Sequence, residues 1–306
     1  MKHILVIGGS YFVGRVLCTL ASREPDEYKI TIVNRGRYKV NKPNVEELVC
    51  DRHNTLQMRT LLAGRSFDAV VDLCGYAPGD ATPLIDFLSE TTAHYIFVST
   101  ASVYEYHPEC RDESTPKITE AGDIPGGEYA LQKALLEDEV IDACQRHGMA
   151  WTIYRPSFIY GPYNYAQRES FYVRIAVNKG LIPVPYDSHS SFTFVYAIDV
   201  AQALLRSAGD KRVFNEVFNL SGPEALTYSE YMAAFEKAYG EPVDVRLVSI
   251  SEVLQQKIPL PFPLETNEVY NGEKFAKAMD FQYTPFTDGF GVAVRVFKDV
   301  FESQKR

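Results

Sequence analysis

The sequence lacks any dense block of lysine and arginine, and its 306 residues carry a formal charge of −9 at pH 7. Surfaces that bind nucleic acid or an anionic membrane need a positive field, so this charge argues against both partners and leaves room only for a local basic pocket. No apolar run approaches the length of a membrane span. The first apolar run begins within a few residues of Met1, which leaves no room for a signal peptide, and we expect a cytoplasmic protein.

Cysteine is scarce and follows no pattern. The five cysteines are an odd number and include no Cys-x-x-Cys pair, which excludes a disulfide framework and a zinc-type ligand set. We therefore expect no metal site, and cysteines that serve as small core residues in a reducing cytosol. They are Cys18, Cys50, Cys74, Cys110 and Cys144.

Internal repeats, low-complexity tracts and flexible linkers are also absent. The length suffices for a full core, so we expect one enzyme-sized unit whose second lobe is woven into the first. The expected division is a larger domain at 1–160 with a return segment at about 190–222, and a smaller lobe at 161–189 and 223–306.

The beginning of the chain carries the strongest local pattern. An aliphatic run from Ile4 to Ile7 leads into a glycine turn and then into apolar residues at helical spacing, which predicts a strand, a tight turn and a helix. Such a turn brings backbone N–H groups at a helix start close to a pyrophosphate. The alternative is a buried strand and helix with an ordinary Gly-Gly turn. The turn consists of Gly8, Gly9, Ser10, Tyr11, Phe12, Val13 and Gly14.

Further strands alternate with helices along the first half of the chain. This rhythm predicts an α/β fold, a doubly wound parallel sheet of the Rossmann type with a smaller, interwoven C-terminal substrate lobe. Ligands of such sheets lie in the crevice at the carboxyl ends of the strands. Strands are expected at 28–33, 45–50, 67–74, 95–99, 151–155 and 217–220, helices at 80–90, 128–147, 197–207, 228–238 and 288–301, and loops at 161–165 and 183–185.

Three Tyr–Lys pairs have the four-residue spacing that places both side chains on one helix face: Tyr38/Lys42, Tyr129/Lys133 and Tyr270/Lys274. Only the pair at 129 and 133 opens the long helix that follows the fifth strand, where the helix start lies over the crevice. Hydroxyls at 99–104 end that strand.

These groups together form a device for proton transfer. Tyr129 is the expected general acid/base, Lys133 is expected to lower its pKa and to hold the cofactor ribose, and Thr100 to polarise the substrate oxygen. The other two pairs are expected outside the crevice. The alternative is a solvated Tyr–Lys face beside a plain Ser/Thr turn.

Taken in order, these motifs resemble the extended short-chain dehydrogenase/reductase family, of the nucleotide-sugar epimerase and dehydratase type. The matching stretches are 8–14, Asp51, 99–104, 129–133, 155–162 and 194–201. The resemblance implies that Asp51 contacts the adenine, that Leu73, Cys74 and Gly75 line the cofactor, and that Pro156 to Phe158 lie beside the nicotinamide. It also implies dimerisation through the helices near 80–90 and 128–147.

The expected sites follow from the turn, the strand ends and this resemblance. The cofactor site further includes Asn34, Arg35, Arg37, Arg52 and Ser99, and the substrate site consists of Tyr76, Ser102, Asn164 and Phe192.

The sequence departs from this family at positions that limit which substrates and reactions we expect. Tyr11 replaces a glycine in the middle of the turn, where the backbone approaches the phosphates. Phe158 and Phe192 replace an Asn and an Arg that bind nucleotide-sugar phosphates, and aromatic rings cannot neutralise a diphosphate. Ala101 and Ser102 stand where sugar dehydratases place an Asp-Glu pair. We therefore expect weak binding of UDP- or dTDP-sugars and no 4,6-dehydration.

The end of the second strand bears on cofactor choice. An acidic residue there would hold the ribose 2′-OH of NAD, whereas Asn34, Arg35 and Arg37 offer donors that suit the 2′-phosphate of NADP. The cofactor is thus expected to be NADP or NAD, with NADP favoured. The alternative is a merely solvated basic turn.

A narrower resemblance is to the subgroup that includes the chloroplast stem-loop RNA-binding proteins, through the glycine turn, the Asn-Arg-Gly strand end, Asp51-Arg52 and a stretch like 155–165. Plant members look depleted of the Tyr-x-x-x-Lys pair that this chain keeps, and its retention favours an enzyme. We expect an NAD(P)-dependent oxidoreductase or epimerase acting on a small molecule. The rival hypothesis is a nucleotide-bound protein that binds RNA or a protein partner without turnover.

Overall fold

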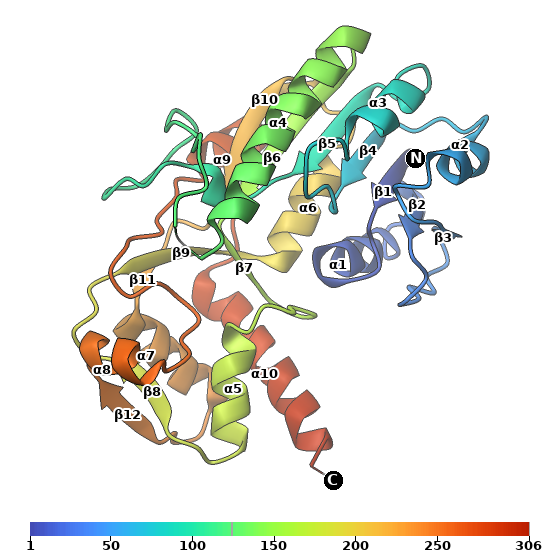
Figure 1. The fold of residues 1–306 in the computed structure, drawn as a ribbon. Coiled ribbons are helices and arrows are strands. Elements are labelled where there is room, and N and C mark those ends of the chain that lie inside the picture. The colour runs from blue at the N-terminus through green and yellow to red at the C-terminus, as the bar shows by residue number, and fades with distance from the viewer. Residues whose placement is uncertain (124, 306) are drawn as a thin grey trace.

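A seven-stranded parallel sheet forms the centre of the larger lobe (Figure 1), in the order β10-β6-β5-β4-β1-β2-β3. The computed structural model describes residues 1–123 and 125–305. Every neighbouring pair in this sheet is parallel, which confirms the doubly wound α/β fold. The strands are β1 (Lys2–Ile7), β2 (Tyr28–Asn34), β3 (Val45–Val49), β4 (Ala69–Asp72), β5 (His94–Val98), β6 (Ala150–Pro156) and β10 (Glu216–Leu220).

Helices cover both faces of this sheet because its strands are apolar on both sides. In β1, Ile4 and Val6 face one core, whereas Leu5 and Ile7 face the other. The first core is shared with α1 (Phe12–Ala21) and α6 (Ala197–Ser207). The second is shared with α2 (Thr55–Leu62), α3 (Thr82–Leu88) and α4 (Gly127–His147).

The smaller lobe is built on two short sheets, of β11, β9 and β7 and of β12 and β8. Its core is mostly aromatic, with rings of Tyr160, Phe194, Tyr231 and Phe290 packed in one cluster. The strands are β7 (Phe158–Tyr160), β8 (Ile182–Pro185), β9 (Ser191–Tyr196), β11 (Ala225–Thr227) and β12 (Val245–Val248). The helices are α5 (Glu169–Val177), α7 (Tyr228–Tyr239), α8 (Ile250–Gln256) and α10 (Phe286–Ser303).

Several local features differ from the sequence-based expectations, among them the following. Residues 183–185, expected as a loop, belong to β8, because a short two-stranded sheet tolerates prolines when Ile182 and Val184 alternate with them. Helix α2 was not predicted. Helix α9 (Glu273–Met279) lies in a segment expected to belong to the substrate lobe, yet Phe275 and Met279 enter the core of the large sheet.

Within the described ranges, no helix combines the length and the apolar character that a membrane crossing needs.

A buried ion pair fixes α4 to β6. Arg155 donates to Glu137 through Nε (3.0 Å) and Nη2 (2.6 Å), and both side chains are almost fully buried. The guanidinium also lies over the ring of Tyr104, with 4.7 Å to its centroid. Such a pair is tolerated inside a protein only because its geometry compensates the lost hydration of both charges.

Replacing Glu137 with Leu should therefore lower the free energy of unfolding by about 3–5 kcal/mol, since Arg155 is left as a buried charge. Adding Arg155→Met should recover much of the loss, because no guanidinium is then buried. Urea unfolding measures both effects. Glu273→Gln, which breaks an exposed pair with Lys277, should change stability very little. A Glu137→Leu protein as stable as the parent would contradict this account.

Candidate functional site

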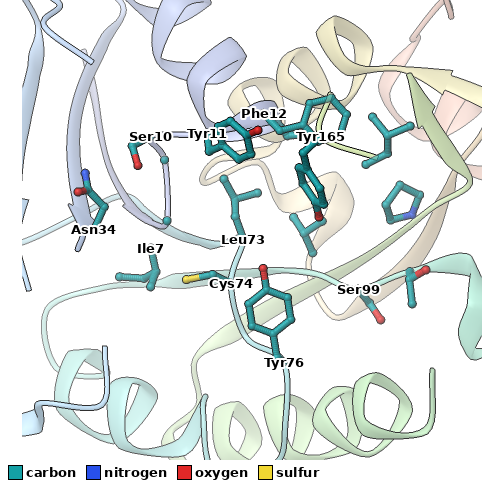
Figure 2. A pocket seen from close by; sticks show the side chains of 18 of the residues that line it. Ile7, Ser10, Tyr11, Phe12, Asn34, Leu73, Cys74, Tyr76, Ser99 and Tyr165 are labelled. Carbon is teal, nitrogen blue, oxygen red and sulfur yellow. The ribbon is translucent and has the colours of Figure 1, made fainter. Parts of the chain in front are cut away.

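A cavity of about 770 Å³ opens at the carboxyl ends of β1, β2, β4, β5 and β6 (Figure 2). It is lined by all of the expected cofactor residues except Gly75, and by Thr100, Ser102 and Tyr76 from the other expected sets. In Figure 2, Tyr11 and Tyr165 lie together on one side of the cavity and Tyr76 lies across from them. The structure thus brings the sequence-selected residues of seven separate segments into one cavity.

The glycine turn adopts backbone conformations that explain its composition. Gly8 and Gly9 have φ values of 113° and 64°, in the region that favours glycine. A Cβ on Gly14 would lie 2.5 Å from the Cα of Gly9, so the start of α1 can approach the turn only without a side chain there. The turn and the start of α1 thus line the cavity, where the N–H groups of a helix start can donate to an anion.

Tyr11 occupies its unusual position without backbone strain, because its φ of −138° is ordinary extended backbone. Its side chain is 46% exposed and stacks between Tyr38 and Tyr165, with ring centroids 5.2 and 5.6 Å away. We call Tyr38, Tyr11 and Tyr165 the tyrosine stack. It connects the loop after β2, the glycine turn and the loop after β7 at the mouth of the cavity.

Three buried polar atoms on the cavity wall make no hydrogen bond to any described residue: Asn34 Nδ2, Ser99 Oγ and Ser157 Oγ. Unsatisfied buried donors are costly and are usually paired when a ligand is present. Asn34 uses only its Oδ1, which accepts the N–H of Gly36 at 2.6 Å. These open donors, together with the cradle of Gly8 and Gly9, fit the ribose and phosphate groups of a dinucleotide.

Arg52 lines the cavity, but its guanidinium is held in the wall. It donates to both carboxylate oxygens of Asp72, at 2.8 and 2.9 Å, and to the carbonyl of Asp80. Asp72 is fully buried and also accepts from Tyr95 Oη and the Cys74 N–H. Burial alone would raise the pKa of Asp72, yet the Arg52 charge and these hydrogen bonds bring it below its ordinary value.

Tyr129 lies at the inner end of the cavity, at the start of α4, and is 45% exposed. Removal of the phenol from water raises the pKa of Tyr129 to about 12, while the Thr100 hydroxyl and the Arg168 charge act in the opposite direction. The phenol is thus protonated at neutral pH, and the expected lowering of its pKa by Lys133 is not found, because burial is the larger effect. Thr100 also accepts the N–H of Ser102 at 3.2 Å, which orients its hydroxyl.

Lys133 is one helical turn beyond Tyr129 and only 2% exposed. Its ammonium donates to the carbonyls of Gly75 and Val98, both at 2.8 Å, and lies 4.4 Å from the ring centroid of Phe97. Burial lowers the pKa of Lys133 to about 8, whereas the negative charge of Asp72 acts to raise it. The amine therefore changes its charge within the range in which the protein can be assayed.

The other two Tyr–Lys pairs do not lie outside the cavity as expected, since Tyr38 and Tyr270 both line it. Neither pair has the helical geometry that its spacing suggested. Tyr38 precedes β3 in a loop, and Tyr270 precedes α9 and donates to Glu268.

Three expected contact residues lie away from the cavity wall. Phe192 is completely buried in the aromatic core of the smaller lobe, against Phe262. Asn164 is buried on the carboxylate of Glu169, to which its Nδ2 donates at 3.2 Å. Gly75 lies behind the wall, where a Cβ would come within 3.0 Å of Phe97. Their roles in this structure are in packing and support.

Arg168 is a cavity residue that sequence reasoning missed. It donates from Nη1 to the carbonyl of Ile159 at 2.7 Å and lies 4.9 Å above the ring of Phe158. Its one sequence signal is that it is the only cation between residues 156 and 173, in the loop that follows a strand end.

A sequence model of the NAD dependent epimerase/dehydratase family matches residues 4–221. The chain is 28% identical over 260 residues to the chloroplast stem-loop binding protein of 41 kDa b of Arabidopsis thaliana, covering 79% of this chain and 64% of that protein's length. It is 22% identical over 270 residues to the NAD(P)H azoreductase of Xenophilus azovorans, covering 88% and 85%. The shared family stretch includes the glycine turn and the Tyr129/Lys133 pair.

A solved structure shows the same fold. The dTDP-glucose 4,6-dehydratase from Bacillus anthracis str. Ames, in complex with NAD, superposes with a TM-score of 0.79 at 18% identity and covers 99% of this chain and 98% of its own. The resemblance inferred from the motifs is thereby confirmed at the level of the family. The chain belongs to the NAD-dependent epimerase/dehydratase family.

Proposed function

We propose that this protein transfers a hydride between a nicotinamide dinucleotide and a secondary alcohol or ketone carbon, as an oxidoreductase or epimerase, with Tyr129 as general acid/base. The observation that carries the proposal is the convergence of Tyr129, Thr100 and Lys133 at one end of a cavity whose other walls hold open polar donors. When bound, the nicotinamide supplies or accepts the hydride.

The residues of the chain divide the remaining work. The turn from Gly8 to Gly14 would hold the pyrophosphate, the strand end at Asn34 and Asp51 the adenosine, and Lys133 the nicotinamide ribose. Tyr129, protonated at neutral pH, gives its proton to the substrate oxygen in reduction and takes it back in oxidation. Thr100 donates a hydrogen bond to the same oxygen.

The cofactor preference of NADP over NAD belongs to the same proposal. Arg35 and Arg37 line the cavity at the end of β2, and Asn34 Nδ2 has no described partner. The Bacillus anthracis enzyme named above holds NAD, so the proposal for this chain rests on its own strand end.

Several coarser features are proposed alongside. The division into a dinucleotide domain and a substrate lobe is supported by the return of β10 to the large sheet. Dimerisation through α3 and α4 and a cytoplasmic location rest on the family resemblance and on the sequence. UDP-sugars should bind weakly, since Phe158 supplies no charge and Arg168, above its ring, cannot alone neutralise both phosphates.

The rival function, binding of RNA without turnover, is favoured by two observations. One relative is named for stem-loop binding, and the tyrosine stack offers ring faces on which bases could stack. The net charge of −9 opposes it, because phosphate contacts supply most of the affinity for nucleic acid. Turnover assays of the variants below distinguish the two functions.

Tyr129→Phe should reduce turnover by the order of 10²–10⁴, the usual contribution of a general acid/base, while leaving the affinity for the dinucleotide nearly unchanged. Nicotinamide absorbance during a screen of alcohols and ketones measures turnover, and direct titration measures affinity. Tyr186→Phe is the matched control, because Tyr186 is exposed and lies outside the cavity lining. A Tyr129→Phe enzyme as fast as the parent would favour the rival.

Lys133→Met should weaken dinucleotide binding at pH 7, and the difference from the parent should shrink as the pH rises to about 9.5. The reason is that the parent ammonium, whose pKa is lowered to about 8, loses its charge over this interval and then resembles the neutral variant. Titration calorimetry at several pH values measures the ratio of affinities. A ratio that stays constant across the range would contradict an electrostatic role for Lys133.

Arg35→Ala should weaken NADP(H) binding by about tenfold or more and leave NAD(H) binding almost unchanged, because only NADP(H) carries the 2′-phosphate. Both cofactors are titrated into the parent, into Arg35→Ala and into Arg23→Ala, an exposed arginine outside the cavity lining. Equal affinities for both cofactors in all three proteins would show that the basic turn is merely solvated.

A further inference from the structure

The charged side chains of the cavity are strongly biased toward one sign. The chain has 40 acidic and 31 basic residues apart from histidine. The charged residues of the cavity lining, by contrast, are Arg35, Arg37, Asp51, Arg52, Lys133 and Arg168. Asp51 is the one acidic residue among them, so the cavity is a local cationic site in an acidic protein.

Most of these cations already have an assignment. Arg52 is neutralised by Asp72 inside the wall. Arg35 and Arg37 follow β2 and lie at the adenosine end, and the Lys133 ammonium is held by two carbonyls beside the presumed ribose. The proposed function assigns no role to Arg168.

Arg168 makes no ion pair with a described carboxylate, although the charge of the neighbouring Glu169 acts on it through space. Among the described residues, the hydrogen bond made by its guanidinium is to the Ile159 carbonyl. The adjacent Glu169 does not pair with it, because that buried carboxylate accepts from the Gly161 N–H at 2.8 Å and from Asn164. A guanidinium has five N–H donors, and most of those of Arg168 remain open.

The neighbours of Arg168 place it at the substrate end. It stacks over Phe158, which belongs to the segment expected beside the nicotinamide. Arg168 and Tyr129 both line this cavity, and the Arg168 charge acts to lower the pKa of Tyr129. If Arg168 only held the Ile159 carbonyl and the Phe158 ring in place, it would need neither a permanent charge nor free N–H donors facing the cavity.

We propose that Arg168 is a specificity-determining residue that binds an oxyanion of the substrate, a carboxylate or a phosphoryl group, beside the carbon that reacts near Tyr129. The inference rests on the proposed function and names its substrate class, an anionic alcohol or ketone. One guanidinium pairs with a single carboxylate or phosphoryl group through two parallel hydrogen bonds. The apolar faces of Phe158 and Tyr165 on the same wall suit the uncharged part of such a substrate.

The test titrates inorganic phosphate and malonate separately into the protein saturated with NAD⁺, whose pyrophosphate then occupies the glycine turn. Arg168→Gln should weaken binding of at least one anion by about tenfold or more, and Arg168→Lys should restore part of it, because a charge returns without the planar fork. If Arg168→Gln weakens the binding of phosphate alone, the substrate carries a phosphoryl group. If it weakens the binding of malonate alone, the substrate carries a carboxylate. Arg174→Gln, which alters an exposed arginine on the same helix α5, should bind both like the parent.

Unchanged binding of both anions in Arg168→Gln, or no binding of either anion to the parent, would overturn the inference. Thermal unfolding of Arg168→Gln and its affinity for NAD⁺ show whether the variant folds and keeps its cofactor site. The titrations are repeated without NAD⁺, and the difference between parent and Arg168→Gln is measured again. If the parent binds the anion more tightly than Arg168→Gln does but binds no dinucleotide, the anion site is supported and the proposed function is contradicted.

Discussion

One buried ammonium joins the sheet, the long helix and the cavity. Lys133 extends from α4 to the carbonyls of Gly75 and Val98, which follow or end two adjacent strands. A charge this deep is stable only when such dipoles replace its water. The helix therefore has one position over the strand ends, and Tyr129, a turn earlier, is brought to the inner end of the cavity. Close packing also favours glycine at position 75, because a Cβ there would lie 3.0 Å from Phe97 and 3.1 Å from Leu136.

The regular part of the fold and most of the site could be predicted from the sequence, because both depend on local periodicity. Strands of a parallel sheet are short apolar runs, and their carboxyl ends are fixed once the strands are located. Helix register then determines where Tyr129 and Lys133 lie. The capping box at Thr227 and Glu230 likewise marks the start of α7 within the predicted bounds.

Prediction fails where no periodicity determines the direction of a side chain. The segment from 157 to 168 is mostly irregular, so the sequence does not tell that Asn164 turns inward to Glu169 while Arg168 faces the cavity. Composition likewise does not predict which aromatic side chains are buried in the core and which line the cavity. Phe192 and Phe262 stack in the core of the smaller lobe, whereas Tyr11 and Tyr165 stack at the cavity mouth. Only tertiary packing separates these two groups of rings.

Strand β10 has a kinetic consequence through its place in the sheet. It pairs with β6, although residues 157–215, including half of the smaller lobe, lie between them in the chain. Closing so long a loop costs entropy before the pairing repays it, which makes this contact late in folding. During synthesis, a nascent chain that already contains every residue of the glycine turn and α4 still has the edge of β6 unpaired. The edge of β6 can therefore pair only after residues 157–220, with the first half of the smaller lobe, have been made, and until then this edge is where premature association would begin.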